Sequence, residues 1–173
     1  MKTKIKSILM LVFLLASFTS TAQMFSKKKS KKDTHNFRYE IQCIGEGKQG
    51  TYAIKVFSYS KKPNVAIEAA KRNAVHGIIF KGISGGECVN KPALARSANL
   101  EQEKADFFKD FFANGGKYSK FVVASTDGAI EAGDVTKVSK KEFKVGVNVS
   151  VNVSLLRKDL EAAGIIQGLG SRF

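Results

Sequence analysis

The stretch Phe143-Lys-Val145-Gly-Val147-Asn-Val149-Ser-Val151-Asn-Val153 alternates apolar and polar residues without a break. Successive side chains of a β-strand point to opposite faces, so this alternation predicts a strand with one buried and one polar face. That combination is typical of an antiparallel sheet covered on one side. We therefore expect the fold to be built around this segment.

Two earlier segments predict a β-hairpin. Residues 37–43 alternate in the same way, and residues 51–59 alternate again after a glycine-rich stretch at 45–50. Short alternating segments joined by such a stretch are typical of neighbouring antiparallel strands. The apolar side of the first strand consists of Phe37, Tyr39, Ile41 and Cys43.

Helical patterns lie between these strands and after the last one. A helix is expected from Asn64, as its N-cap, to about Lys81, just before Gly82. A second, amphipathic helix is expected over residues 99–113 and a short closing helix over residues 155–163. The second helix gathers four phenylalanines on one face, where we expect them to lie in the core: Phe107, Phe108, Phe111 and Phe112.

The order of these elements predicts an α+β fold. Residues 118–125 are expected to form a strand, whereas residues 83–98 show no period and are expected to form a loop. The predicted architecture is a two-layer sandwich with a mainly antiparallel sheet of about four strands, two longer helices and a short C-terminal helix. It forms a single domain over residues 36–173.

Composition is that of an ordinary globular domain. Of the 173 residues, 43% are hydrophobic and 25% are charged. This apolar content excludes a fully disordered or collagen-like chain, and the sequence lacks the apolar runs of about 18 residues that a polytopic membrane protein needs.

The first 22 residues have the pattern of a secretory signal peptide. Three lysines precede an apolar run at residues 8–18, and the small residues Ser20 and Ala22 follow it. Cleavage is expected between Ala22 and Gln23. Because no cysteine lies near this junction for lipid attachment, we expect an exported, soluble product with no transmembrane helix after cleavage.

A basic segment follows the expected cleavage site. Residues 23–35 are expected to form a disordered tether that carries five of the positive charges behind the chain's net charge of +14: Lys27, Lys28, Lys29, Lys31 and Lys32. Such a run is either a solvated linker or a binding site for an envelope protein or for lipid or lipopolysaccharide phosphates. Nucleic acid is disfavoured, because the run lacks interleaved aromatic residues and the expected address is outside the cytoplasm.

Cys43 and Cys88 form an even pair in a chain with an export signal. Two states are consistent with the sequence: a disulfide between them, which an oxidising compartment allows, or two buried free thiols. These two cysteines with His35 and His76 make four potential zinc ligands, but they lack the short paired spacing that zinc sites use. The sequence therefore predicts no metal and no cofactor.

Catalytic patterns are weak. The motif Gly45-x-Gly47-x-x-Gly50 resembles the glycine-rich loop of protein kinases, but Lys55 follows too soon and the other kinase motifs are missing, so a hairpin turn is predicted. His76 is the one histidine expected on a rigid element. The alternative function, a small periplasmic hydrolase or ligand-binding protein, would use a pocket around His76 and the loop from Ser84 to Pro92.

The alanines of the first predicted helix carry a resemblance. In element order, and in the pattern Ala66, Ala69, Ala70 and Ala74, the middle third of the chain resembles small exported α/β domains of bacterial envelope proteins, of the flagellar-assembly and outer-membrane lipoprotein type. The resemblance implies an assembly or binding part without catalysis. The leading hypothesis is thus an exported, non-enzymatic binding or assembly module with no catalytic residues. The resemblance implies that it lies in the periplasm or at the outer-membrane periphery of a Gram-negative bacterium.

Overall fold

The computed structural model describes residues 37–125, 130 and 132–168. The described part belongs to a compact unit that begins at Phe37, close to the boundary expected at residue 36. The expected signal peptide and basic segment lie outside the described residues. Among the described residues, no helix combines the length and apolar character needed to cross a bilayer.

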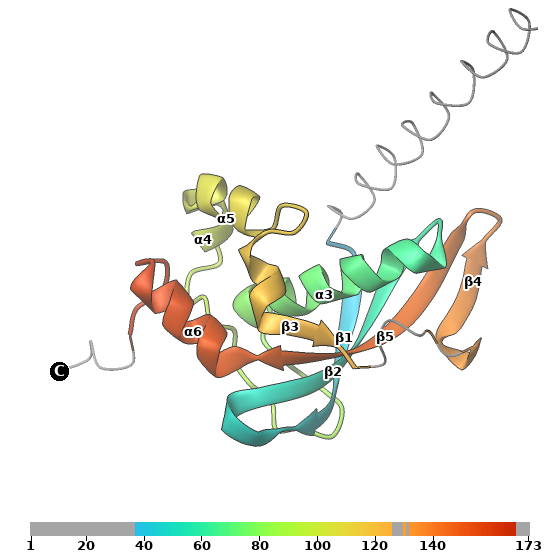
Figure 1. Ribbon diagram of the computed structural model, residues 1–173, viewed down its shortest axis with the longest axis horizontal. Helices are drawn as coiled ribbons and strands as arrows, with labels where there is room; N and C mark the ends of the chain where they lie inside the picture. Colours follow the sequence, from blue (N-terminus) through green and yellow to red (C-terminus); the bar gives the residue numbers. More distant parts are fainter. Residues whose placement is uncertain (1–36, 126–129, 131, 169–173) are drawn as a thin grey trace, which may run out of the picture. The chain divides into compact units, whose positions relative to one another are not determined.

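Strand β5 (Glu142–Asn152) is the centre of a five-stranded antiparallel sheet (Figure 1). One of its edges pairs with β2 (Thr51–Ser60), which pairs in turn with β1 (Tyr39–Glu46). Its other edge is shared by β3 (Val122–Ala124) and β4 (Val135–Ser139), which bind opposite halves of the strand. The expected α+β class is confirmed. The sheet curls into a half-barrel, so the two-layer sandwich is not confirmed.

Alternation in β5 produces the buried face that the sequence predicts. Val145, Val147, Val149 and Val151 are all at most 2% exposed. Their register with β2 places Ile54 opposite Val149 and Val56 opposite Val147. The sheet therefore presents a continuous apolar surface for a helix to cover.

Helix α3 (Pro63–Phe80) covers this surface (Figure 1). Its alanines are buried, and a side chain at Gly77 would clash with Ile41 of β1. Small residues thus allow the helix to approach the sheet closely. The expected N-cap is wrong, because Lys62 has the extended cap conformation and Pro63 occupies the first helical position.

The second predicted helix is divided in two. Lys104 leaves helical geometry at φ −116° and ψ 33°, which separates α4 (Leu100–Glu103) from α5 (Ala105–Phe111). The expected core role of the phenylalanines is confirmed, because Phe108, Phe111 and Phe112 are buried and Phe107 is partly buried. The break lets α4 turn Glu101 towards α3 while α5 keeps its rings in the core.

The last segments differ in part from the prediction. Residues 117–121 form a 3-10 turn, so only the end of the expected strand at 118–125 becomes β3. Strand β4 is not predicted from the sequence. Helix α6 (Val153–Ala162) follows β5 directly, and Gly164 has the positive φ of 65° expected after its end.

The glycine-rich motif forms the turn of the β1–β2 hairpin, as predicted. A short 3-10 turn covers Lys48–Gly50, where Gln49 and Gly50 both have positive φ. No helix begins at Gly50, and β2 starts at the next residue.

Candidate functional site

His76 lies at the centre of a buried aromatic cluster. It is 5% exposed and sits on the inner side of α3. The ring of Phe37 stacks on it, with centroids 3.7 Å apart, and the rings of Phe80 and Phe112 lie at 4.8 and 5.6 Å. The imidazole is therefore enclosed by hydrocarbon on several sides.

Both ring nitrogens of His76 have partners. Nδ1 lies 2.6 Å from the hydroxyl of Tyr39 on β1, and Nε2 lies 3.2 Å from Oε1 of Glu101 on α4. The neutral ring satisfies both contacts when Nδ1 accepts from the Tyr39 hydroxyl and Nε2–H donates to the carboxylate. This chain of hydrogen bonds connects the sheet, α3 and α4.

Burial fixes the protonation of this network. It lowers the pKa of His76 to about 3, with a further contribution from the positive charge of Lys81. Burial also raises the pKa of Tyr39, as does the negative charge of Glu101, and burial raises the pKa of Glu101. The imidazole is therefore neutral near pH 7, with its acceptor nitrogen already occupied.

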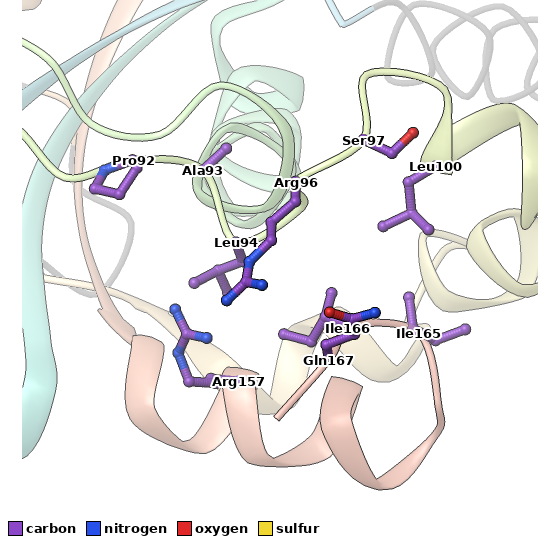
Figure 2. A pocket seen from close by; sticks show the side chains of 10 residues that line it. All are labelled: Pro92, Ala93, Leu94, Arg96, Ser97, Leu100, Arg157, Ile165, Ile166 and Gln167. Atoms are coloured by element: carbon purple, nitrogen blue, oxygen red, sulfur yellow. The ribbon is translucent and has the colours of Figure 1, made fainter. Parts of the chain in front are cut away.

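Two adjoining hollows lie elsewhere on the folded unit. The larger has a volume of about 510 Å³ and lies between the segment 92–97 and α6 with the residues that follow it (Figure 2). The smaller, of about 320 Å³, shares Pro92, Leu94 and Arg157 with it and extends to the β1–β2 turn at Gly50. His76 lines neither of these two hollows. The alternative function expects a pocket around His76 and the loop from Ser84 to Pro92. Of that loop, only Lys91 and Pro92 line either hollow.

The larger hollow combines apolar walls with two arginines. Its apolar lining includes Leu94, Leu100 and Ile165, whereas Arg96 and Arg157 bring guanidinium groups. Figure 2 shows both guanidinium groups at the Leu94 end of the hollow, and Leu100 and Ile165 at the other end. This is the arrangement of apolar and charged groups that a ligand with a polar head and an apolar body needs.

The structure joins the expected cysteine pair. Cys43 of β1 and Cys88 form a disulfide with a Cα–Cα distance of 5.6 Å. Beside it, the backbone of Cys43 accepts a hydrogen bond from Glu87 N at 3.0 Å and donates one to Gly85 O at 3.3 Å. The loop after α3 is thus attached to the outer edge of the sheet. Sequence reasoning left this bond open, because it could not place the loop.

No group of three or more potential metal ligands occurs within the described ranges. The disulfide also removes both cysteines from the zinc set considered above, and His35 lies outside the described residues. His76 uses both nitrogens in its own network.

The polar face of the sheet carries paired charges. Three ion pairs connect its strands with each other, with the residue before β1 and with the turn before β4: Arg38–Glu142 at 3.2 Å, Lys55–Asp134 at 2.6 Å and Lys144–Glu40 at 2.7 Å. Arg38 also lies 4.0 Å from the ring centre of Tyr59. Acidic partners thus offset the basic groups of this face. The five expected binding lysines, Lys27 to Lys29, Lys31 and Lys32, lie outside the described residues.

No family model, curated protein or solved structure matches this chain.

Sequence reasoning missed the two arginines of the larger hollow. Arg96 lies in a loop without periodicity, and Arg157 has the spacing of an ordinary exposed helix position. Nothing local to either residue indicates that they face a common space. The only available signal was a basic residue within an otherwise apolar loop segment, Pro92-Ala-Leu-Ala-Arg96, and that signal is weak.

Proposed function

We propose that this chain is an exported, non-enzymatic binding or assembly module of a Gram-negative envelope. The observation that carries the proposal is the Cys43–Cys88 disulfide in the folded unit. Structural disulfides persist in oxidising compartments and are rare in the cytosol. The disulfide therefore agrees with the signal-peptide pattern of residues 1–22, which is an independent feature of the same chain.

The basic segment would provide the contact with the envelope. Its five lysines lie within six consecutive positions, 27–32. Each lysine near an anionic membrane surface contributes about 1 kcal/mol, so several together provide a salt-sensitive attachment. An acidic face on a partner protein would attract the same segment.

The alternative, a small hydrolase acting through His76, has less support. A general base needs a nitrogen that can reach the proton it removes. The acceptor nitrogen of His76 is occupied by the Tyr39 hydroxyl, and aromatic rings enclose the imidazole. These contacts support a role for His76 in joining the sheet to the helices.

Export is tested by the N-terminus of the accumulated protein. The chain is expressed in a Gram-negative host, and the host is fractionated. Mass spectrometry of the protein in the envelope and periplasmic fractions is expected to show a chain that begins at Gln23. A full-length chain retained in the cytoplasm would contradict the proposal.

Attachment through the basic segment is tested on vesicles. The exported protein is expected to sediment with vesicles containing phosphatidylglycerol, to be released by salt, and to lose binding when residues 24–32 are deleted. The matched control removes five positive charges from exposed positions of the folded unit and leaves the segment intact: Lys104, Lys109, Lys120, Lys140 and Lys158, each changed to Gln. Equal loss in both variants would show that net charge alone is responsible and would overturn the role of the segment.

A second measurement separates the two surfaces that the segment could recognise. Crosslinked partners are recovered from fractionated cells with the exported protein and with the deletion variant. An envelope protein recovered only with the intact segment supports an assembly role. If neither vesicles nor envelope proteins distinguish the two forms, the proposal is wrong.

A further inference from the structure

The larger hollow has two walls whose backbones are fixed by hydrogen bonds. On one side, Leu94 N and Ala95 N donate to the carbonyls of Ile78 and Ile79 near the end of α3, at 3.1 and 2.8 Å. On the other side, Ile165 N donates to the carbonyl of Leu160 at 2.9 Å, which closes the end of α6. The space between them is thus preformed, and a ligand would bind without ordering either wall.

Two arginines, Arg96 and Arg157, give one end of this hollow an excess of positive charge. Arg96 is exposed and forms no ion pair or hydrogen bond with any residue in the described part of the chain. Arg157 lies 3.6 Å from Glu161, one turn further along α6. That distance is longer than the 2.7–2.9 Å typical of a charge-assisted hydrogen bond. Only Arg157 therefore has a carboxylate nearby, and both guanidinium groups retain unused N–H donors.

Placing like charges beside each other is unfavourable unless an anion lies between them. A guanidinium group presents a planar set of donors that matches a carboxylate or phosphate. The two arginines come from different elements, the loop before α4 and helix α6, and both reach into the same hollow (Figure 2). The arrangement is complementary to a small anionic group.

Apart from Ser97 and Gln167, the rest of the hollow is lined by apolar residues. Leu94, Leu100 and Ile165 are each at most 9% exposed, and Ile166 lies beside them. A volume of 510 Å³ falls within the range of about 300 to 1,000 Å³ that is typical of small-molecule sites. An inorganic anion would leave most of this space unfilled, whereas a ligand with an apolar chain would fill it.

We propose that this hollow binds a small amphiphilic anion, with its carboxylate or phosphate between Arg96 and Arg157 and its apolar chain against Leu94, Leu100, Ile165 and Ile166. This site is separate from the basic segment at residues 27–32. The folded unit therefore carries a ligand site of its own, whatever the segment binds.

The test uses the purified protein and residue-resolved amide NMR. Octanoate, octyl phosphate, inorganic phosphate and 1-octanol are each added at matched concentrations. Saturable shifts confined to residues 92–100 and 157–168 are expected for octanoate, octyl phosphate or both. Much weaker shifts are expected for inorganic phosphate and 1-octanol, because each supplies only half of the recognised chemistry.

Arginine variants test the headgroup contact. The double variant Arg96→Gln/Arg157→Gln is expected to raise the dissociation constant about tenfold or more, which corresponds to the loss of charge-assisted hydrogen bonds. Lys158→Gln is the matched control, because Lys158 is an exposed cation on the same helix but does not line the hollow. Its dissociation constant is expected to stay within about twofold of the parent, since surface charges away from a site contribute little.

Several results would overturn this site. One is the absence of saturable shifts with both amphiphiles, and another is equal weakening by the double variant and by Lys158→Gln. Equal binding of 1-octanol and octanoate would show a purely apolar hollow and would remove the arginines from the argument. Unchanged amide spectra of the variants without ligand serve as the check that they fold. Because the basic segment is intact in every variant, failure here leaves the envelope-binding proposal untouched.

Discussion

The hydroxyl of Tyr39 lies 2.6 Å from Nδ1 of His76 and joins the first strand of the sheet to the C-terminal part of α3. The other nitrogen of the same ring reaches Glu101, so one imidazole connects three elements. Tyr39 also contacts Lys81, whose Nζ lies 4.0 Å from the centre of the Tyr39 ring. Because the network is buried, His76 stays uncharged in the folded protein, and the stability of the fold depends on pH.

Stability is expected to fall between pH 7.5 and 5.5 because of His76. Its pKa is about 3 in the folded protein and about 6.5 in the unfolded chain. Over this range His76 binds a proton in the unfolded chain but not in the folded protein. The free energy of unfolding therefore decreases by about 1.4 kcal/mol as the pH falls. Urea unfolding at a series of pH values measures this slope.

The variant His76→Gln identifies the source of that slope. It is expected to unfold more easily than the parent at every pH but to lose the dependence between pH 7.5 and 5.5. The raised pKa of Glu101 acts in the opposite sense, because its protonation favours the folded state. A slope that persists unchanged in His76→Gln would contradict the assignment.

Much of the architecture follows from local patterns in the sequence. Alternation located β5 and the β1–β2 hairpin, because a half-buried strand must place every second side chain in the core. The small residues of α3 favour close packing on a sheet, and at Gly77 an added side chain would meet Ile41 of β1. These features depend on neighbours within a few residues.

Other features depend on contacts between distant segments. Strand β4 has weak alternation and mostly exposed side chains, so its own sequence does not predict it. It forms because its backbone pairs with the edge of β5. The break at Lys104 allows Glu101 to meet His76, a partner on another helix. The arginines of the larger hollow line the same space only because α6 lies beside the loop before α4. Local periodicity contains none of this information.

The disulfide is expected to contribute substantially to stability. A bond closing a loop of 45 residues removes chain entropy from the unfolded state worth about 3 to 4 kcal/mol. The double variant Cys43→Ala/Cys88→Ala is expected to lower the free energy of unfolding by about that amount. Urea unfolding measures the change. Val89→Ala is the control in the same loop, because Val89 is 74% exposed and its loss is expected to be nearly neutral. A double variant as stable as this control would show that the disulfide is dispensable.

Gly86 is expected to be far less tolerant of substitution than its neighbour Gly85. Both have positive φ, 87° and 79°, so alanine is strained at either position. At Gly86 the added methyl group would also clash with the backbone of Cys43, whereas at Gly85 it would meet open space. We expect a loss of about 1 kcal/mol for Gly85→Ala and about 3 kcal/mol or more for Gly86→Ala.

Thermal unfolding of the two glycine variants checks this difference. Because both substitutions lie in the same loop and add the same group, composition and unfolded-state entropy cancel between them. Equal losses would mean that the loop moves away from Cys43 without cost. The close backbone approach beside the disulfide would then be unimportant for stability.

Asn152 is expected to stabilise the junction between β5 and α6. Its Oδ1 accepts a hydrogen bond from Leu155 N at 2.9 Å, which is the contact of a helix N-cap. The alternation of residues 143–153 predicts Asn152 on the polar face of the strand, and the structure shows that the residue ends the strand and begins the helix. Asn152→Ala is expected to cost about 1 kcal/mol, and Asn152→Asp much less, because aspartate also accepts the capping bond. Urea unfolding of both variants measures the difference. An alanine variant as stable as the aspartate variant would show that α6 begins without this cap, held in place only by Leu156 and Leu160, its two buried side chains in the core.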